Sequence, residues 1–158
     1  MKKNEKTNVM RVLYQKKVSY VSHSYVDTDA ISGVEVAKVL NQDPNQVFKT
    51  LVTIGASKKY YVYLVPVHKE LDLKKAAKAV GEKSIVMLPA KDLLPLTGYI
   101  HGGCSPIGMK KQFQTTIDHT AANFDTIVFS AGKIGYQVEL PLEELKKVIR
   151  FELKEITE

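Results

Sequence analysis

The sequence offers little for covalent or metal-based chemistry. Its single cysteine, Cys104, excludes an intramolecular disulfide, and the four histidines at positions 23, 68, 101 and 119 lack the spacing of metal-ligand pairs. We therefore expect no bound metal. A nucleophilic Cys104 has no obvious histidine and carboxylate partners, and a small thiol in a turn is more often a packing residue.

Long apolar segments are also missing. No window approaches the roughly 18 consecutive apolar residues that a membrane helix requires, and the best candidate is the short stretch 60–67. The start of the chain, MKKNEKTN, is polar, and no apolar segment follows it as in a secretory leader. We expect a cytoplasmic protein without membrane contact, built as one domain over residues 1–158 that needs no disulfide or metal for stability.

Positive charge is in moderate excess, with 23 lysines and arginines against 17 acidic residues and a net charge of +6. This excess favours encounters with nucleic acids or phosphates without identifying either. Basic and aromatic residues adjoin at 48–49 and 58–63, where they could stack a base and neutralise a phosphate. Aromatic residues in strands are usually core residues, however, and lysines in hairpin turns are usually solvated. Composition alone leaves both interpretations open.

The spacing of apolar residues predicts an α+β fold. Ser32 and Glu35 have the spacing of a capping box, and Gly81 stands where a helix should end. Helices are expected at 7–17, 32–40, 71–80 and 141–150, and strands at 19–26, 48–55, 60–67, 84–88, 114–118, 126–131 and 136–140. Because the two kinds alternate irregularly, we expect a mixed, strongly curved or barrel-like sheet of about six to seven strands, flanked by about four helices.

One stretch, TGYIHGGCSPIGMKK at 97–111, has the composition of a ligand-binding loop. Its four glycines leave few side chains in the way, so main-chain groups can approach a partner, and the loop leads into Lys110 and Lys111. Peptide groups beside fixed positive charges suit a small polar group attached to a polyanion. The loop lacks the signature of a P-loop or a dinucleotide fingerprint, which argues against ATP and NAD. A plain glycine-rich turn is the alternative interpretation.

Three motifs carry a resemblance to a known family. VFKTL at 47–51, the glycine-rich loop and FSAGKIG at 129–135 together resemble the YbaK/EbsC-type Cys-tRNA(Pro) deacylases. ELDLKKAAKAVG at 70–81 and ID at 117–118 follow in the family's order, so that the likeness spans nearly the whole chain. These proteins are related to the editing domain of bacterial prolyl-tRNA synthetase. The resemblance implies an editing-domain-like α+β fold and removal, in trans, of amino acids wrongly attached to tRNA.

The resemblance also implies roles for individual residues. Lys49 matches the family's essential lysine, Gly102 the glycine whose backbone holds the aminoacyl group, and Ser130 the serine at the far side of the pocket. Substrate binding is implied for Tyr25, Ile31, Phe48, Thr50, Gly103, Ser105 and Pro106, and contacts with tRNA phosphates for Lys110, Lys111 and Lys133. Ile134 stands where the family usually has arginine, which removes one expected contact with the tRNA backbone.

The expected chemistry needs no cofactor and no catalytic triad. An aminoacyl ester is already activated, so its cleavage chiefly needs positioning and stabilisation of developing charge. Lys49 could pair with the terminal adenosine's phosphate, which we favour, or with the carbonyl under attack. The family resemblance implies that the substrate's own cysteine thiol attacks that carbonyl, forming a cyclic thioester and releasing the tRNA.

The sequence leaves more than one candidate substrate and partner open. A proline synthetase pocket rejects an amino acid of smaller or equal size by only about 1–3 kcal/mol, which is why a second sieve is needed. The expected substrate is the 3′ aminoacyl end of mischarged Cys-tRNA(Pro), with Cys-tRNA(Cys) as a further candidate and prolyl-tRNA synthetase as a partner that selects the tRNA. The alternatives are an Ala-tRNA(Pro) deacylase that uses water and a non-catalytic module that binds tRNA acceptor ends or a synthetase.

Overall fold

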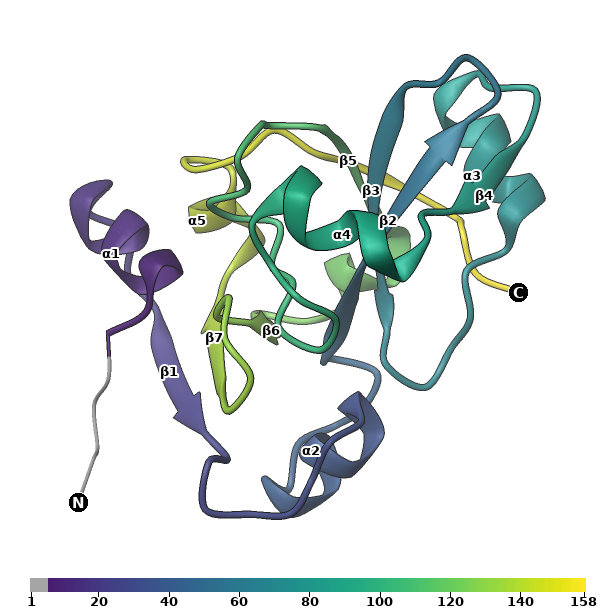
Figure 1. The fold of residues 1–158 in the computed structure, drawn as a ribbon. Coiled ribbons are helices and arrows are strands. Elements are labelled where there is room, and N and C mark those ends of the chain that lie inside the picture. The colour runs from purple at the N-terminus through teal and green to yellow at the C-terminus, as the bar shows by residue number, and fades with distance from the viewer. Residues whose placement is uncertain (1–5) are drawn as a thin grey trace.

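Two β-sheets form the frame of the molecule (Figure 1). The computed structural model describes residues 6–158, so the first five residues of the polar start lie outside the described part. The smaller sheet is antiparallel, with the order β1 (Val21–Ser24), β7 (Tyr136–Leu140) and β6 (Ile127–Ser130). The larger sheet is mixed, with the order β4 (Ile85–Met87), β2 (Phe48–Gly55), β3 (Tyr60–Pro66), β5 (Gln114–Asp118) and β8 (Glu152–Lys154).

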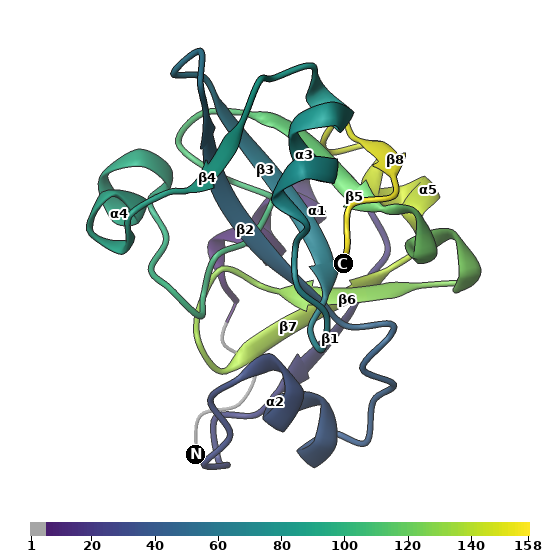
Figure 2. The ribbon, with the colours of Figure 1, turned by 90° about the vertical axis from the view of Figure 1, so that its right-hand side faces the viewer.

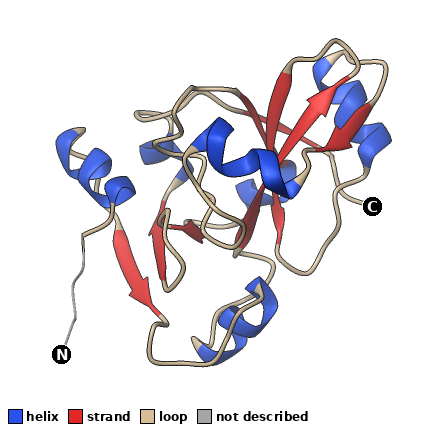
Figure 3. Ribbon diagram, viewed as in Figure 1, coloured by secondary structure: helices blue, strands red, loops and turns tan. Residues whose placement is uncertain are grey.

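Short helices surround these sheets (Figure 3). They are α1 (Asn8–Gln15), α2 (Gly33–Val39), α3 (Leu73–Val80), α4 (Ala90–Thr97) and α5 (Leu142–Leu145), with a 3-10 helix η1 (His119–Asn123) after β5. The predicted caps are confirmed: the Ser32 hydroxyl accepts from the Glu35 N–H at 3.2 Å, and Gly81 ends α3 with a φ of 76°. Within residues 6–158, no helix is long and apolar enough to cross a membrane.

The α+β class is confirmed, but the prediction of one strongly curved or barrel-like sheet is wrong. Residues 6–158 contain two sheets with eight strands and five α-helices, and neither sheet curls into a barrel. The sheets separate because β2 and β6 are linked only by one parallel bridge, Val47 to Val128. The predicted helix at 141–150 stops at Leu145, and residues 152–154 instead add a strand beside β5.

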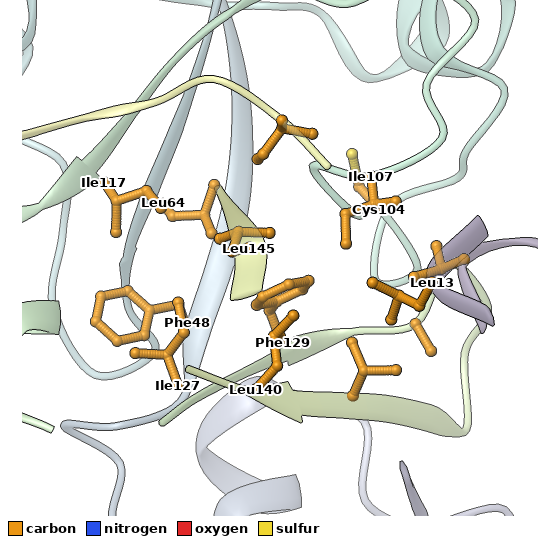
Figure 4. Close-up of a cluster of buried hydrophobic side chains, with 14 of the residues drawn as sticks. Leu13, Phe48, Leu64, Cys104, Ile107, Ile117, Ile127, Phe129, Leu140 and Leu145 are labelled. Atoms are coloured by element: carbon orange, nitrogen blue, oxygen red, sulfur yellow. The ribbon is translucent and has the colours of Figure 1, made fainter. Parts of the chain in front are cut away.

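Side-chain alternation along β2 divides the interior. Phe48 and Val52 face the main core between the two sheets, which α1 and the glycine-rich loop close (Figure 4). Leu51 faces the other way, toward a second cluster under α3 that contains Tyr63 and Ala76. Burying a phenylalanine such as Phe48 fully contributes about 1.5–3 kcal/mol. This packing fixes both faces of β2 and therefore the direction in which each of its side chains points.

Candidate active site

The residues just before β2 lie beside β6. The Val128 N–H donates to the Gln46 carbonyl at 3.1 Å, and Val47 and Val128 form the parallel bridge between the sheets. Two residues further on, the chain reaches Lys49 on β2 and Ser130 on β6. Because side chains alternate with a period of two, both point to the face of Val47 and Val128, which packs against α2. Lys49 and Ser130, which are 81 residues apart in the sequence, thus each follow the bridge by two residues on this face.

The ammonium group of Lys49 lies at the edge of this face. Its Nζ is 3.6 Å from the carboxylate of Glu70, and 29% of the Lys49 side chain is exposed against 75% of the Glu70 side chain. Ion pairs this exposed contribute about 0–1 kcal/mol, so a stronger anion can replace the carboxylate. Lys49 is therefore a partly enclosed cation with an exchangeable counter-ion.

The glycine pair of the loop packs against the turn that follows Ser130. A Cβ atom on Gly103 would lie 3.2 Å from the backbone nitrogen of Ile134, and one on Gly102 would lie 3.6 Å from the end of the Ile134 side chain. Gly102 also has a φ of +88°, which strongly favours glycine. The Ser130 hydroxyl accepts a 3.0 Å hydrogen bond from the Gly132 N–H, which holds the same turn. Gly102, Gly103 and Ser130 thus meet around residues 131–135.

Two further predicted residues come from the segment between β1 and α2. The Tyr25 N–H donates to the Gly135 carbonyl at 2.8 Å, which ties the end of β1 to the same turn. Ile31 precedes the Ser32 cap, and 83% of its surface is exposed. The start of α2 packs closely against Val67, since a Cβ atom on Gly33 would lie only 2.6 Å from the Val67 side chain. Tyr25 is thus joined to the site by its backbone, whereas Ile31 projects into solvent at the start of α2.

Four of the predicted substrate-binding residues lie behind this surface. Phe48 is 2% exposed and points into the main core, on the face of β2 opposite to Lys49 (Figure 4). The hydroxyl of Thr50, on that same face, is buried and has no hydrogen-bond partner among the described residues. Ser105 is fully buried and accepts from the Ile107 N–H at 3.3 Å, and Pro106 is also buried. These four side chains are thus buried or partly buried, and their contact with the substrate stays a prediction.

The three lysines predicted to contact tRNA have different surroundings. Lys110 donates to the Pro95 carbonyl at 3.2 Å and so lies along the last turn of α4. Lys111 is exposed, and the Lys133 ammonium lies 6.0 Å from the centre of the Tyr136 ring. Lys133 sits in the turn against which the two glycines pack, so its backbone belongs to the site.

Sequence reasoning missed Tyr99, which organises the glycine-rich loop from inside. Its hydroxyl donates to the Ile107 carbonyl at 2.5 Å, and Cβ atoms on Gly108 and Gly132 would lie 2.8 and 3.0 Å from Tyr99 atoms. Burial raises the pKa of Tyr99 to about 12, the Cys104 thiol adds to this, and a hydrogen bond with Asn8 of α1 opposes it. The sequence signalled this role only by a tyrosine that stands among glycines.

The chemistry of Cys104 is limited by its burial. The residue is 7% exposed and lies beside Ile107 in the main core (Figure 4). Burial raises the pKa of its thiol to about 12, so the thiolate is scarce at neutral pH. This supports the interpretation of Cys104 as a packing residue. Among residues 6–158, no three His, Cys, Asp or Glu side chains are grouped so that they could hold a metal ion.

The chain is similar over most of its length to known proteins. An Enterococcus faecalis protein, provisionally named the Cys-tRNA(Pro)/Cys-tRNA(Cys) deacylase EbsC, is 45% identical over 157 residues, covering 99% of this chain and 96% of that one.

Solved structures share the fold. A protein provisionally described as a trans-editing enzyme for prolyl-tRNA synthetase is 22% identical with a TM-score of 0.81, covering 95% of this chain and 94% of its own. A hypothetical protein is 17% identical with a TM-score of 0.82, over 95% and 99% of the two chains. The family model described as the aminoacyl-tRNA editing domain matches residues 28–148. The chain therefore belongs to the aminoacyl-tRNA editing domain family.

Proposed function

We propose that this protein is a trans-editing deacylase that removes cysteine from Cys-tRNA(Pro), with Cys-tRNA(Cys) as a further substrate. The observation that carries the proposal is the placement of Lys49 and Ser130 on one face, next to the turn on which Gly102 and Gly103 pack. The name of the 45% identical relative supports the same substrate. The active unit would be a single editing domain over residues 1–158, acting in the cytoplasm.

In this proposal, Lys49 binds the phosphate of the terminal adenosine. The phosphate replaces the exposed carboxylate of Glu70 as the counter-ion of the ammonium group, which costs little because that ion pair is weak. An ammonium group with three donors suits a phosphate oxygen without demanding one fixed geometry. Lys49 therefore anchors the end of the tRNA and leaves the ester bond beside the glycine pair.

Gly102 and Gly103 would hold the aminoacyl group through their peptide groups. With no side chain at either position, the backbone can approach the ester closely, and Ser130 bounds the far side of the site. Tyr25 and Ile31 would close the side nearest α2, and the ribose 2′-hydroxyl would distinguish RNA from DNA. Phe48, Thr50, Ser105 and Pro106 would act from behind, by fixing β2 and the loop.

The bond-breaking step would use the substrate's own thiol and no metal. The cysteine sulfur attacks the ester carbonyl carbon, the bond between that carbon and the ribose oxygen breaks, and the thiol proton ends on the ribose oxygen. The tRNA leaves with a free hydroxyl, and water later opens the cyclic thioester to give cysteine. The protein contributes proximity and charge stabilisation, which is consistent with a site that has no strong nucleophile of its own.

We infer that prolyl-tRNA synthetase is the partner that selects the tRNA. The proposed pocket recognises the aminoacyl end, which all tRNAs share apart from the amino acid. A complex with the synthetase would deliver the mischarged product directly, and a mixture of both proteins should therefore clear Cys-tRNA(Pro) faster than Cys-tRNA(Cys).

The test is release of labelled cysteine from Cys-tRNA(Pro) by the purified full-length chain. Release well above the rate in buffer is expected, and alkylation of the substrate thiol should stop it. Continued release from alkylated Cys-tRNA(Pro), or faster release from Ala-tRNA(Pro), would favour attack by water. Tight tRNA binding without release of any amino acid would identify a non-catalytic binding module instead.

A further inference from the structure

A basic hollow lies between α3 and the segment at β8. Figure 2 shows these two elements side by side. They cover the face of the larger sheet on which Leu51 lies, and Lys49 shares that face by alternation. The volume of the hollow is about 380 Å³, and three lysines against one carboxylate give it a positive lining: Lys75, Lys78, Ala79, Lys154 and Glu155. None of these residues belongs to the site described above. Their charge makes the hollow suited to an anion.

Hydrogen bonds hold one wall of the hollow in place. The Lys75 ammonium donates to the Thr157 carbonyl at 2.8 Å and to the Glu155 carboxylate at 3.1 Å, which fixes one wall. Lys78 is exposed and has no ion pair among the described residues. The Lys154 ammonium lies 3.9 Å from the Glu152 carboxylate. Both side chains are exposed, so a phosphate could replace this carboxylate as the counter-ion of Lys154.

A continuous run of contacts connects the hollow to Lys49. Glu70, the partner of Lys49, accepts a 3.1 Å hydrogen bond at its carbonyl from the Glu158 N–H. The neighbouring Leu71 forms a bridge with Thr157, the residue that Lys75 holds. Helix α3 then rises by about 1.5 Å per residue away from Glu70. Lys75 therefore lies in the first turn of α3 and Lys78 in the second, after the segment that carries Glu70.

We propose that this hollow binds backbone phosphates of the tRNA acceptor arm, upstream of the nucleotide held by Lys49. The inference rests on the proposed function, because it takes the anion at Lys49 to be the end of a tRNA. A tRNA anchored there carries one charge per nucleotide, so a nearby surface of opposite charge stabilises the phosphates of the stem that follows its single-stranded 3′ end. Recognition of this kind reads no sequence, which leaves the choice of tRNA to the synthetase partner.

The test replaces Lys78 and Lys154 by alanine together and leaves Lys75, whose bond to Thr157 supports the fold. Binding of uncharged tRNA(Pro) is measured against salt concentration. Each lost phosphate contact lowers the slope of log K against log salt by about 0.7–0.9, so the double variant should lose between one and two units of slope. In deacylation of full-length Cys-tRNA(Pro), KM should rise several-fold, with kcat little changed.

A charge-matched control and a shortened substrate make the test specific. Lys16, which caps the end of α1, and Lys91 on α4 are exposed lysines outside the hollow. Their double alanine variant should keep the wild-type slope and KM. On a cysteinylated oligonucleotide that carries only the single-stranded 3′ end, the Lys78→Ala/Lys154→Ala variant should match wild type, because this substrate has no acceptor stem to reach the hollow.

Equal salt slopes for wild type and the hollow variant would overturn the proposal, and so would equal losses in the control variant or a defect that persists on the short oligonucleotide. A failure of the proposed function has a different signature. In that case wild type releases no cysteine from either substrate, while the tRNA-binding slopes still report on the hollow.

Discussion

The Tyr99 hydroxyl donates a 2.5 Å hydrogen bond to the carbonyl of Ile107, eight residues further along the same loop. This bond closes the glycine-rich loop around a buried ring that is 7% exposed. Asn8 and Val9 of α1 lie against the same region, close to Gly108 and Gly132. The N-terminal helix, which precedes the part matched by the family model, therefore supports both the loop and the turn that form the site.

Tyr99→Phe should keep the ring and lose this bond. A buried carbonyl left without its partner costs about 1–3 kcal/mol, so the free energy of unfolding in urea should fall by about that amount. The deacylation rate should fall as well, since Gly102 and Gly103 lie in the loop that the bond closes. Tyr14→Phe is the matched control, because Tyr14 is 72% exposed, and it should change neither quantity. Wild-type stability in Tyr99→Phe would contradict this role.

Gly102→Ala should impair deacylation more than it impairs folding. The φ of +88° imposes strain of about 1–2 kcal/mol on any other residue, while the new Cβ atom would meet Ile134 at an ordinary 3.6 Å. We expect a folded protein whose rate is at least about tenfold lower, because a methyl group enters the space proposed for the ester.

The control for Gly102→Ala is Gly81→Ala. Gly81 has a similar φ of +76° at the end of α3, and a Cβ atom there meets nothing within 4 Å. It should lose comparable stability and keep its activity. Equal loss of activity in both variants would mean that strain, and not access to the Gly102 backbone, explains the effect.

Cys104 should be chemically silent in the folded protein. With the pKa of its thiol raised to about 12 by burial, the reactive thiolate appears only as pH rises toward that value. Iodoacetamide at pH 8 should therefore leave native protein unmodified and label the urea-unfolded chain rapidly. Cys104→Ala should retain deacylation. Rapid labelling of native protein with loss of activity would restore Cys104 as a candidate nucleophile.

Local signals predicted the local structure well. The capping box at Ser32 and the glycine stop at Gly81 depend on neighbouring residues, and both were confirmed. The division into two sheets depends on the single bridge between Val47 and Val128, which no local pattern encodes. Strand β8 was missed for the same reason, since it exists by parallel pairing with β5.

For the candidate site, the family resemblance identified residues but could not predict the direction in which each side chain points. Lys49 and Ser130 were expected to share a pocket, which stays a prediction; each follows the bridge between Val47 and Val128 by two residues, on the same face by alternation. Phe48 was expected beside them, yet alternation along β2 sends it into the main core. Tyr99 and Asn8 were missed because their contact joins segments about 90 residues apart, and neither motif nor spacing reports such pairs.

The most direct measurement of the central claim is the rate of cysteine release from Cys-tRNA(Pro) by Lys49→Ala, beside its affinity for uncharged tRNA. The account predicts loss of release by two orders of magnitude or more, about 3 kcal/mol in the transition state, with the fold intact and tRNA affinity lowered only as far as one lost phosphate contact requires. Release at the wild-type rate by folded Lys49→Ala would contradict it.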